Sequence, residues 1–217
     1  MKVGDEPSLD GMPRELPIFP LGGALMLPRG NLPLNIFEPR YLEMVRDAMG
    51  GDRMIGMVQP KPDGSLYEIG GVGRVTQFTD SENGTFQILL GGVSRFRILD
   101  EMNGDTPYRV AIADYGDFLD DFRQPDGLAA ITRASLEEVM KTYLGAEGLS
   151  ADWEAVEQAD DETLVNTLAS ACPFDPPEKQ ALLEAADLPR RAATLEALMR
   201  FAGEVGETGI SPSNQVH

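Results

Sequence analysis

The sequence has 217 residues, 42% of them hydrophobic and 25% charged, which is enough for one large domain or two small ones with a real core. Its formal net charge of −18 disfavours general affinity for nucleic acid and for anionic membrane surfaces, because both reward clustered Lys and Arg. The single cysteine, Cys172, excludes an intrachain disulfide, the acidic N-terminus has no signal-peptide core, and no apolar run reaches the roughly 18 residues of a membrane span. We therefore expect a cytoplasmic protein.

The charge is unevenly spread along the chain. Residues 1–110 carry 11 Lys/Arg and 15 Asp/Glu, a net of −4, whereas residues 111–217 carry 7 and 21, a net of −14. The two halves therefore have different surfaces, which suggests two subdomains, although an acidic helical half also serves solubility alone.

The first half reads mainly as short strands. After a polar segment, 1–14, expected to be flexible, apolar or alternating runs bounded by turn residues predict strands at Leu16–Phe19, Leu32–Phe37, Arg53–Gln59, Gly73–Thr79, Thr85–Leu90, Arg95–Leu99 and Tyr108–Ala113. Within Gly73–Thr79, period-two alternation places Val75 and Gln77 on one face and Arg74, Thr76 and Phe78 on the other. One helix interrupts these strands, with Pro39 at its first position and Gly50-Gly51 at its end.

The second half reads as helices. Apolar residues at helical spacing predict helices at 125–144, 161–172, 177–186 and 189–202. In the first of these, the predicted apolar stripe consists of Leu128, Ile131, Leu136, Val139 and Tyr143. The lone tryptophan, Trp153, either anchors this helical layer or sits on an interface. The expected fold is α+β, an antiparallel β-barrel at 15–116 followed by a helical bundle at 117–203 and a flexible tail at 204–217.

Catalytic machinery is missing from the pattern. The one histidine is His217, the last residue, so no positioned imidazole is available for nucleophilic catalysis, and no phosphate-binding Walker loop occurs. Gly70–Gly73 opens a strand, so a bend in the sheet explains it better than a dinucleotide site. We predict no catalytic residues, no metal and no cofactor. The aspartates at 114, 117, 120 and 121 could form a weak divalent-ion site, but a solvated linker fits better. Ser135, Lys141 and Lys179 lack the spacing of a Ser–Lys dyad.

Five segments, in order, resemble the substrate-binding (LON) domain at the N-terminus of Lon-type ATP-dependent proteases. They are Leu16-Pro-Ile-Phe-Pro-Leu21 with Leu34-Asn-Ile-Phe-Glu-Pro-Arg-Tyr41, Asp52-Arg-Met-Ile-Gly-Met57, Gly71-Val-Gly-Arg-Val75, Gly91-Gly-Val-Ser-Arg-Phe-Arg97, and Pro176-Pro-Glu-Lys-Gln-Ala-Leu-Leu-Glu184. The resemblance spans about residues 13 to 203. It implies a PUA-like barrel, a helical subdomain and a role in engaging proteins. In those proteases the ATPase and peptidase parts lie beyond this domain, so proteolysis is not expected of this chain.

Two places are candidates for binding. The loop Gly22–Asn31 contains Leu25, Met26, Leu27, Pro28 and Arg29, which form either an exposed apolar patch or part of the core. At the strand-to-helix corner, Glu38, Arg40 and Tyr41 either line a peptide groove or fix the corner, with Glu38 capping, Arg40 in an ion pair and Tyr41 in the core.

The expected function is a non-catalytic module that binds unfolded or partly folded proteins, or a protease or chaperone partner, by apolar contact and by backbone pairing along an edge strand. The alternative is an RNA-binding PUA-like protein, for which Arg74, Arg95, Arg97 and Arg109 would have to gather on one face. An enzyme of another type would need a deep polar pocket with convergent titratable groups.

Overall fold

The computed structural model describes residues 9–81 and 83–207. The chain divides into two compact units, one made of residues up to Pro125 with Ala169–Glu184, the other of Asp126–Leu168 with the residues from Ala185 on. The predicted flexible segments, 1–14 and 204–217, fall largely outside the described residues, but a 3₁₀ helix at Leu9–Gly11 (η1) and a final helix that runs to Glu207 lie inside them. The predicted boundary between 116 and 117 stays a prediction about folding units.

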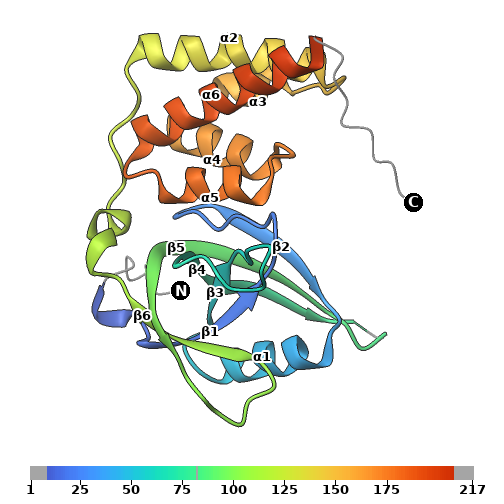
Figure 1. Ribbon diagram of the computed structural model, residues 1–217, viewed down its shortest axis with the longest axis vertical. Coiled ribbons are helices and arrows are strands. Elements are labelled where there is room, and N and C mark those ends of the chain that lie inside the picture. The colour runs from blue at the N-terminus through green and yellow to red at the C-terminus, as the bar shows by residue number, and fades with distance from the viewer. Residues whose placement is uncertain (1–8, 82, 208–217) are drawn as a thin grey trace. The chain divides into compact units, whose positions relative to one another are not determined.

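A mixed six-stranded sheet forms the first unit (Figure 1). Its strands are β1 (Glu15–Pro20), β2 (Asn31–Ile36), β3 (Met54–Val58), β4 (Ile69–Asp80), β5 (Phe86–Glu101) and β6 (Arg109–Asp114). Their order is β2-β5-β4-β3-β1-β6, and β6 also pairs with the far half of β5, so that the sheet closes nearly into a ring. The α+β class with helices after the strands is confirmed.

The prediction of an antiparallel barrel is wrong in one strand pair. β1 and β3 run parallel, with Ile18 opposite Gly56, because β2 and the helix α1 (Pro39–Gly50) between them return the chain to the same end of the sheet. The two predicted strands at Thr85–Leu90 and Arg95–Leu99 are one strand, β5, which continues through Gly91-Gly92 and pairs with three neighbours.

A β-bulge in β4 reverses the predicted face of Phe78. Val75 lies opposite Leu90 but Gln77 lies opposite Leu89, so one extra residue stands on β4 between them. Beyond the bulge, Phe78 is opposite Ile88 and shares its face, the one that Val75 also occupies. Alternation with a strict period of two cannot anticipate this shift.

Helix α1 begins as predicted, with Glu38 at the N-cap and Pro39 in the first turn, and it ends at Gly50. Tyr41, Met44 and Val45 on its buried face join an apolar cluster that includes Phe19, Met57 and Ile88 from the strands. A second cluster surrounds Phe96, which is fully buried inside the sheet with Leu16 and Ile18.

A buried ion pair ties β5 to the segment that follows the sheet, η2 (Gly116–Phe122). The Arg95 guanidinium donates to both carboxylate oxygens of Asp121, at 2.9 and 2.8 Å, and the Arg95 backbone N–H donates to the same carboxylate at 2.8 Å. The two side chains are only 5% and 7% exposed. Arg95 Nη1 also donates to the carbonyl of Leu183, at 3.2 Å, and the guanidinium lies over the Phe118 ring.

Helix α5 (Pro176–Glu184) belongs to the sheet unit although other helices flank it in sequence. Its Gln180 amide donates to the carbonyl of Ile69 on β4, at 3.0 Å, and the buried Gln59 donates to the carbonyl of Pro176, at 3.1 Å. These polar contacts accompany the burial of Leu182 and Leu183 on the same helix, and helical periodicity does not report them.

The second unit contains α2 (Ala130–Ala146), α3 (Trp153–Gln158), most of α4 (Asp161–Ala171) and α6 (Leu188–Glu207). Its buried side chains include Leu136, Met140 and Tyr143 of α2, Leu164 and Val165 of α4, and Leu195 and Met199 of α6. Ile131, which the sequence places on the buried stripe, is 81% exposed. It precedes Leu136 by five residues, which turns it about 140° away around the helix.

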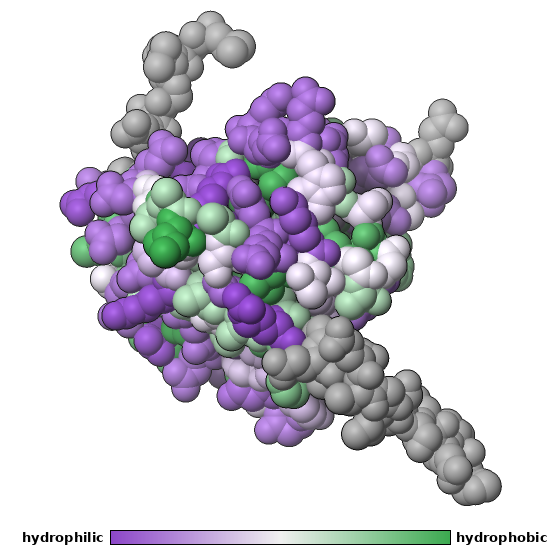
Figure 2. Space-filling view, turned by 90° about the horizontal axis from the view of Figure 1, so that it is seen from above, coloured by the Kyte–Doolittle hydropathy of each residue, from purple (hydrophilic) through white to green (hydrophobic). Residues whose placement is uncertain are grey.

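Trp153 begins α3 and is 37% exposed, with the Lys141 ammonium 5.1 Å from its ring centre. The face seen in Figure 2 carries its apolar side chains as separate green patches among hydrophilic ones. No helix in the described ranges has both the length and the apolarity needed to cross a bilayer.

Asp160 caps the start of α4. Its carboxylate accepts hydrogen bonds from the backbone N–H and the hydroxyl of Thr163, at 2.8 and 2.9 Å. These bonds favour the charged form and hold the pKa of Asp160 below its usual value. The capping contribution is therefore complete well above pH ~4 and is lost as the pH falls through the lowered pKa.

Asp160→Ala is expected to lower the free energy of unfolding by about 1 kcal/mol at neutral pH, because the helix loses its N-cap. Asp160→Asn keeps a capping oxygen that does not titrate, so its free energy of unfolding at neutral pH should be close to that of the native chain. On acidification, its free energy of unfolding should fall less than that of the native chain. Urea unfolding of the three proteins at neutral and acidic pH measures both effects. Equal losses for alanine and asparagine at neutral pH would contradict the capping role.

Candidate functional site

The loop between β1 and β2, residues 21–30, lies directly on the sheet. Leu25, Met26 and Leu27 are each 3% exposed or less, and Pro28 is buried as well. A Cβ atom at Gly71 would stand 1.9 Å from the Met26 carbonyl oxygen, and one at Gly92 would stand 1.9 Å from that of Leu27. The glycines of β4 and β5 are thus the surface on which this loop packs.

Arg29 fixes the end of the loop. Its backbone takes the left-handed conformation (φ 59°), its N–H donates to the Gly92 carbonyl at 2.9 Å, and its guanidinium donates to the Asp121 carbonyl at 2.5 Å. Of the two readings of the loop, the structure shows the core one for Leu25, Met26, Leu27 and Pro28, and only Arg29 is exposed among these five.

At the corner before α1, the side chains of Glu38, Arg40 and Tyr41 contact one another. Arg40 donates to the Glu38 carboxylate at 2.8 and 3.0 Å, and its guanidinium lies 4.6 Å from the centre of the Tyr41 ring. Tyr41 is 6% exposed and packs on Phe19, and burial raises the pKa of its hydroxyl. The Glu38 side chain makes no capping hydrogen bond. Glu38 and Arg40 remain accessible, whereas Tyr41 serves the core.

Two exposed phenylalanines flank this corner, and sequence reasoning did not propose them as contacts. Phe37 follows β2 directly and is 65% exposed, and Phe78 on β4 is 38% exposed. Phe78 packs edge-on against Phe86, with ring centres 4.9 Å apart, and Phe86 is the β5 partner of Ile36. Both rings therefore belong to one end of the β2-β5-β4 sheet, here called the phenylalanine end. The signal was available for Phe37, an aromatic residue immediately past an alternating strand.

Strand β2 presents an open edge, since among the described strands it pairs only with β5. The Gly92 N–H donates to the Gly30 carbonyl, so the backbone N–H and C=O groups of Gly30 and of every second residue after it point toward β5. These residues are Leu32, Leu34 and Ile36. The backbone groups of Asn31, Pro33 and Asn35 then face outward. Pro33 has no N–H, so an added strand finds donors at Asn31 and Asn35 alone.

A family model settles the relationship of the chain. The model of the ATP-dependent protease La (LON) substrate-binding domain matches residues 15–200. This chain belongs to the LON substrate-binding domain family. The match confirms the resemblance carried by the five sequence segments.

Individual relatives agree with the LON assignment. The Lon protease of Desulfosudis oleivorans is 21% identical over 221 residues, covering 95% of this chain and 26% of that protein, and the Lon protease of Anaeromyxobacter dehalogenans is 26% identical over 207 residues, covering 90% and 24%. The LON chain described here thus spans about a quarter of the length of these curated relatives.

Solved structures support the fold. A Lon N-terminal domain protein from Xanthomonas campestris matches 84% of this chain and 97% of its own with a TM-score of 0.63 at 23% identity. The N-terminal domain of a Mycobacterium avium complex Lon protease gives 0.62 at 17% identity, covering 86% and 98%.

The chemical groups considered from the sequence have other partners in this LON domain. Ser135 donates to Glu196, Lys141 lies on Trp153, and the buried Lys179 donates to the Ser170 carbonyl, with burial lowering the pKa of Lys179. In the aspartate run, Asp117, Asp120 and Asp121 pair with Arg97, Arg123 and Arg95. Within the described ranges, no three His, Cys, Asp or Glu side chains group as metal ligands.

Proposed function

We propose that this LON domain is a non-catalytic module that binds unfolded or partly folded polypeptide in the cytoplasm, alone or with a protease or chaperone partner. The family match over residues 15–200 is the observation that carries the proposal, since that model describes a substrate-binding domain. The ATPase and peptidase activities of whole Lon proteases are not part of it.

The phenylalanine end and the open edge of β2 support a two-part mode of binding. Phe37 and Phe78 offer apolar contact to side chains of a bound segment, and complete burial of one such ring is worth about 1.5–3 kcal/mol. The outward backbone groups of Asn31, Pro33 and Asn35 offer pairing to its main chain. Of the residues proposed from the sequence, Glu38 and Arg40 lie next to Phe37 in the chain and are accessible, so we retain them as rim contacts.

Binding of one protein in two states tests the proposal. Reduced, carboxymethylated α-lactalbumin is unfolded and acidic, so the negative charge of this chain gives no nonspecific attraction to it. We expect it to bind in a size-exclusion or anisotropy assay, and native α-lactalbumin not to. Failure of both forms to bind would refute the proposed function, and equal binding would refute the preference for unfolded chains.

Phe37→Ser combined with Phe78→Ser is expected to weaken binding of the unfolded protein about tenfold or more, because two apolar contacts are lost. The control is Leu99→Ser with Leu119→Ser, which also removes two exposed apolar side chains, 59% and 48% exposed, from the same unit. Equal affinity of the two double variants would show that the phenylalanine end is not the contact surface.

The RNA-binding alternative finds less support. Three of its four arginines are ion-paired, Arg95 with Asp121, Arg97 with Glu68 and Asp117, and Arg109 with Glu101. They do not supply the free cationic face that backbone binding requires. Affinity for single-stranded RNA at low salt that falls steeply with added salt would restore this alternative.

A further inference from the structure

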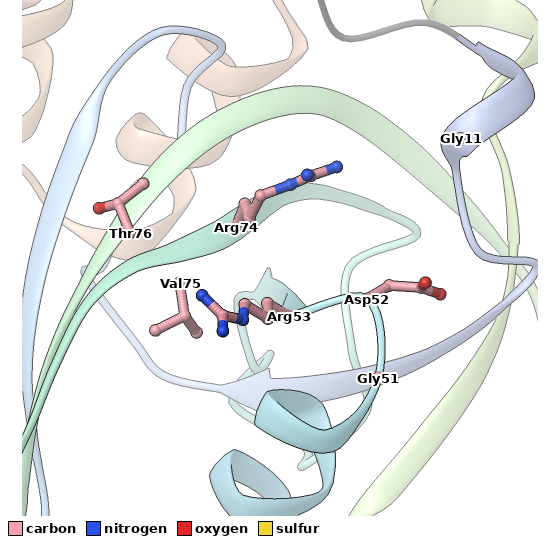
Figure 3. Close-up of a pocket in the computed structure, with 7 residues that line it drawn as sticks. All are labelled: Gly11, Gly51, Asp52, Arg53, Arg74, Val75 and Thr76. Carbon is pink, nitrogen blue, oxygen red and sulfur yellow. The ribbon is translucent and has the colours of Figure 1, made fainter. Parts of the chain in front are cut away.

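A polar cavity of about 560 Å³ lies in the sheet unit, and the turn that follows α1 forms part of its wall. Its lining consists of Gly11, Gly51, Asp52, Arg53, Arg74, Val75 and Thr76 (Figure 3). The volume is in the range of sites that hold small ligands or the end of a larger one, about 300–1,000 Å³.

Within residues 9–81 and 83–207, the side chains of the two arginines of this cavity have no ion-pair, hydrogen-bond or ring partner. In the described part of the chain, the other Lys and Arg side chains, Arg14 apart, have carboxylate, carbonyl, amide or ring partners. Arg53 and Arg74 have none, in a chain with twice as many acidic as basic residues, 36 against 18. Both side chains are exposed, so their guanidinium groups are available to an anionic ligand from outside the chain.

Arg53 is held in a conformation that an arginine rarely adopts. Its φ is 61°, in the left-handed region, where its N–H donates to the Ala48 carbonyl at 2.9 Å. A glycine would take this conformation without cost, and the chain has glycine at 50 and 51 but arginine at 53. A cation near the C-terminus of α1 is favourable for the helix dipole but does not need this backbone angle. Side chains kept at such strained positions cluster at ligand sites.

The charges around the cavity limit the ligand. The sheet places the backbones of the two arginines side by side, since Arg74 is opposite Met54 and the Val75 N–H donates to the Arg53 carbonyl at 2.8 Å. Figure 3 shows Arg74 and Asp52 extending toward the Gly11 side and Arg53 extending toward Val75. The Asp52 carboxylate and the net charge of −18 repel polyanions, so a ligand with a single negative group fits best.

We propose that this cavity binds the free C-terminal carboxylate of a polypeptide, an inference that rests on the proposed polypeptide-binding function. A terminal carboxylate carries one charge and accepts paired hydrogen bonds from a guanidinium group. Asp52 accepts from backbone N–H groups of the same segment.

A matched pair of peptides tests the assignment. One labelled, unstructured peptide is made as the free acid and as the C-terminal amide, and both are titrated by fluorescence anisotropy. The amide is expected to bind about tenfold more weakly, since it lacks the charge-assisted hydrogen bonds. A third peptide, amidated but with one added internal glutamate, asks whether any carboxylate suffices. Recovery of binding by this peptide would overturn specificity for the terminus.

Arg53→Gly combined with Arg74→Gln should abolish the difference between acid and amide. Arg53→Gly relieves the backbone conformation, so we expect the melting temperature to hold or rise while the preference is lost. Arg123→Gln, which removes an 82% exposed arginine, is the charge control and should keep the preference. Equal binding of acid and amide by the native chain would overturn this inference and leave the proposed function standing. Failure of both peptides to bind would overturn both.

Discussion

Asp121→Asn is expected to lower the free energy of unfolding by about 3 kcal/mol or more, the cost of leaving a buried charge without its partner. The Asp121 carboxylate accepts three hydrogen bonds from Arg95, and both side chains are almost fully buried. Asparagine keeps the shape but removes the charge and one acceptor oxygen. The buried guanidinium then lies in a poorly solvated site with only its weaker contacts, among them the Leu183 carbonyl.

The control for this prediction is an exposed ion pair in the same unit. Arg97 donates to Asp117 at 3.0 Å, but the two side chains are 37% and 62% exposed. Asp117→Asn is therefore expected to cost less than about 1 kcal/mol. Urea unfolding followed by circular dichroism compares the two variants. Similar small losses would show that water reaches Arg95 and that the pair contributes little.

A double variant separates the ion pair from its surroundings. Arg95→Met with Asp121→Leu removes both charges, so the loss should be smaller than the sum of the losses of the two single variants. Because Arg95 joins β5, η2 and α5 through Asp121 and Leu183, the same variants should also loosen α5. Faster amide exchange within residues 176–184 of Asp121→Asn, relative to Asp117→Asn, would report that coupling.

Local patterns in the sequence predicted the elements well where the signal is local. Pro39 and Gly50-Gly51 bound α1 as expected. The errors arise where distant residues decide. The burial of Met26 and Leu27 depends on glycines some 45 and 65 positions away, and the parallel pairing of β1 with β3 depends on the long connection through β2 and α1.

The sequence predicted only part of the candidate site, because distant residues also decide which side chains are exposed there. Glu38 and Arg40 were proposed from their types, but the flanking Phe37 was passed over, and the bulge in β4 moved Phe78 to another face. The Arg53–Arg74 cavity was invisible, because no pattern reports a left-handed backbone angle at an arginine or the lack of an ion-pair partner.

Gly71→Ala and Gly92→Ala are each expected to destabilise the sheet unit by about 3 kcal/mol or more. The added methyl carbon would stand 1.9 Å from the carbonyl oxygen of Met26 or Leu27, and a backbone oxygen cannot move without the loop. If the loop stays packed on the sheet, the strands must shift to relieve the clash, which strains the sheet. If the loop lifts, Leu25, Met26 and Leu27 lose their burial, at about 1.5–3 kcal/mol for each side chain.

Gly104→Ala is the matched control for the two glycine variants, since a Cβ at that position meets nothing within 4 Å. Its effect should stay within about 0.5 kcal/mol, as for most exposed substitutions. Hydrogen exchange of the Arg29 and Gly92 amides, which bond across the loop and β5, distinguishes a lifted loop from a strained one. Fast exchange of both amides means that the loop has left the sheet.

Stability of Gly71→Ala equal to that of Gly104→Ala would show that the loop does not pack on these glycines. It would then be free to expose Leu25, Met26 and Pro28 to a bound polypeptide, as the other reading of the sequence holds.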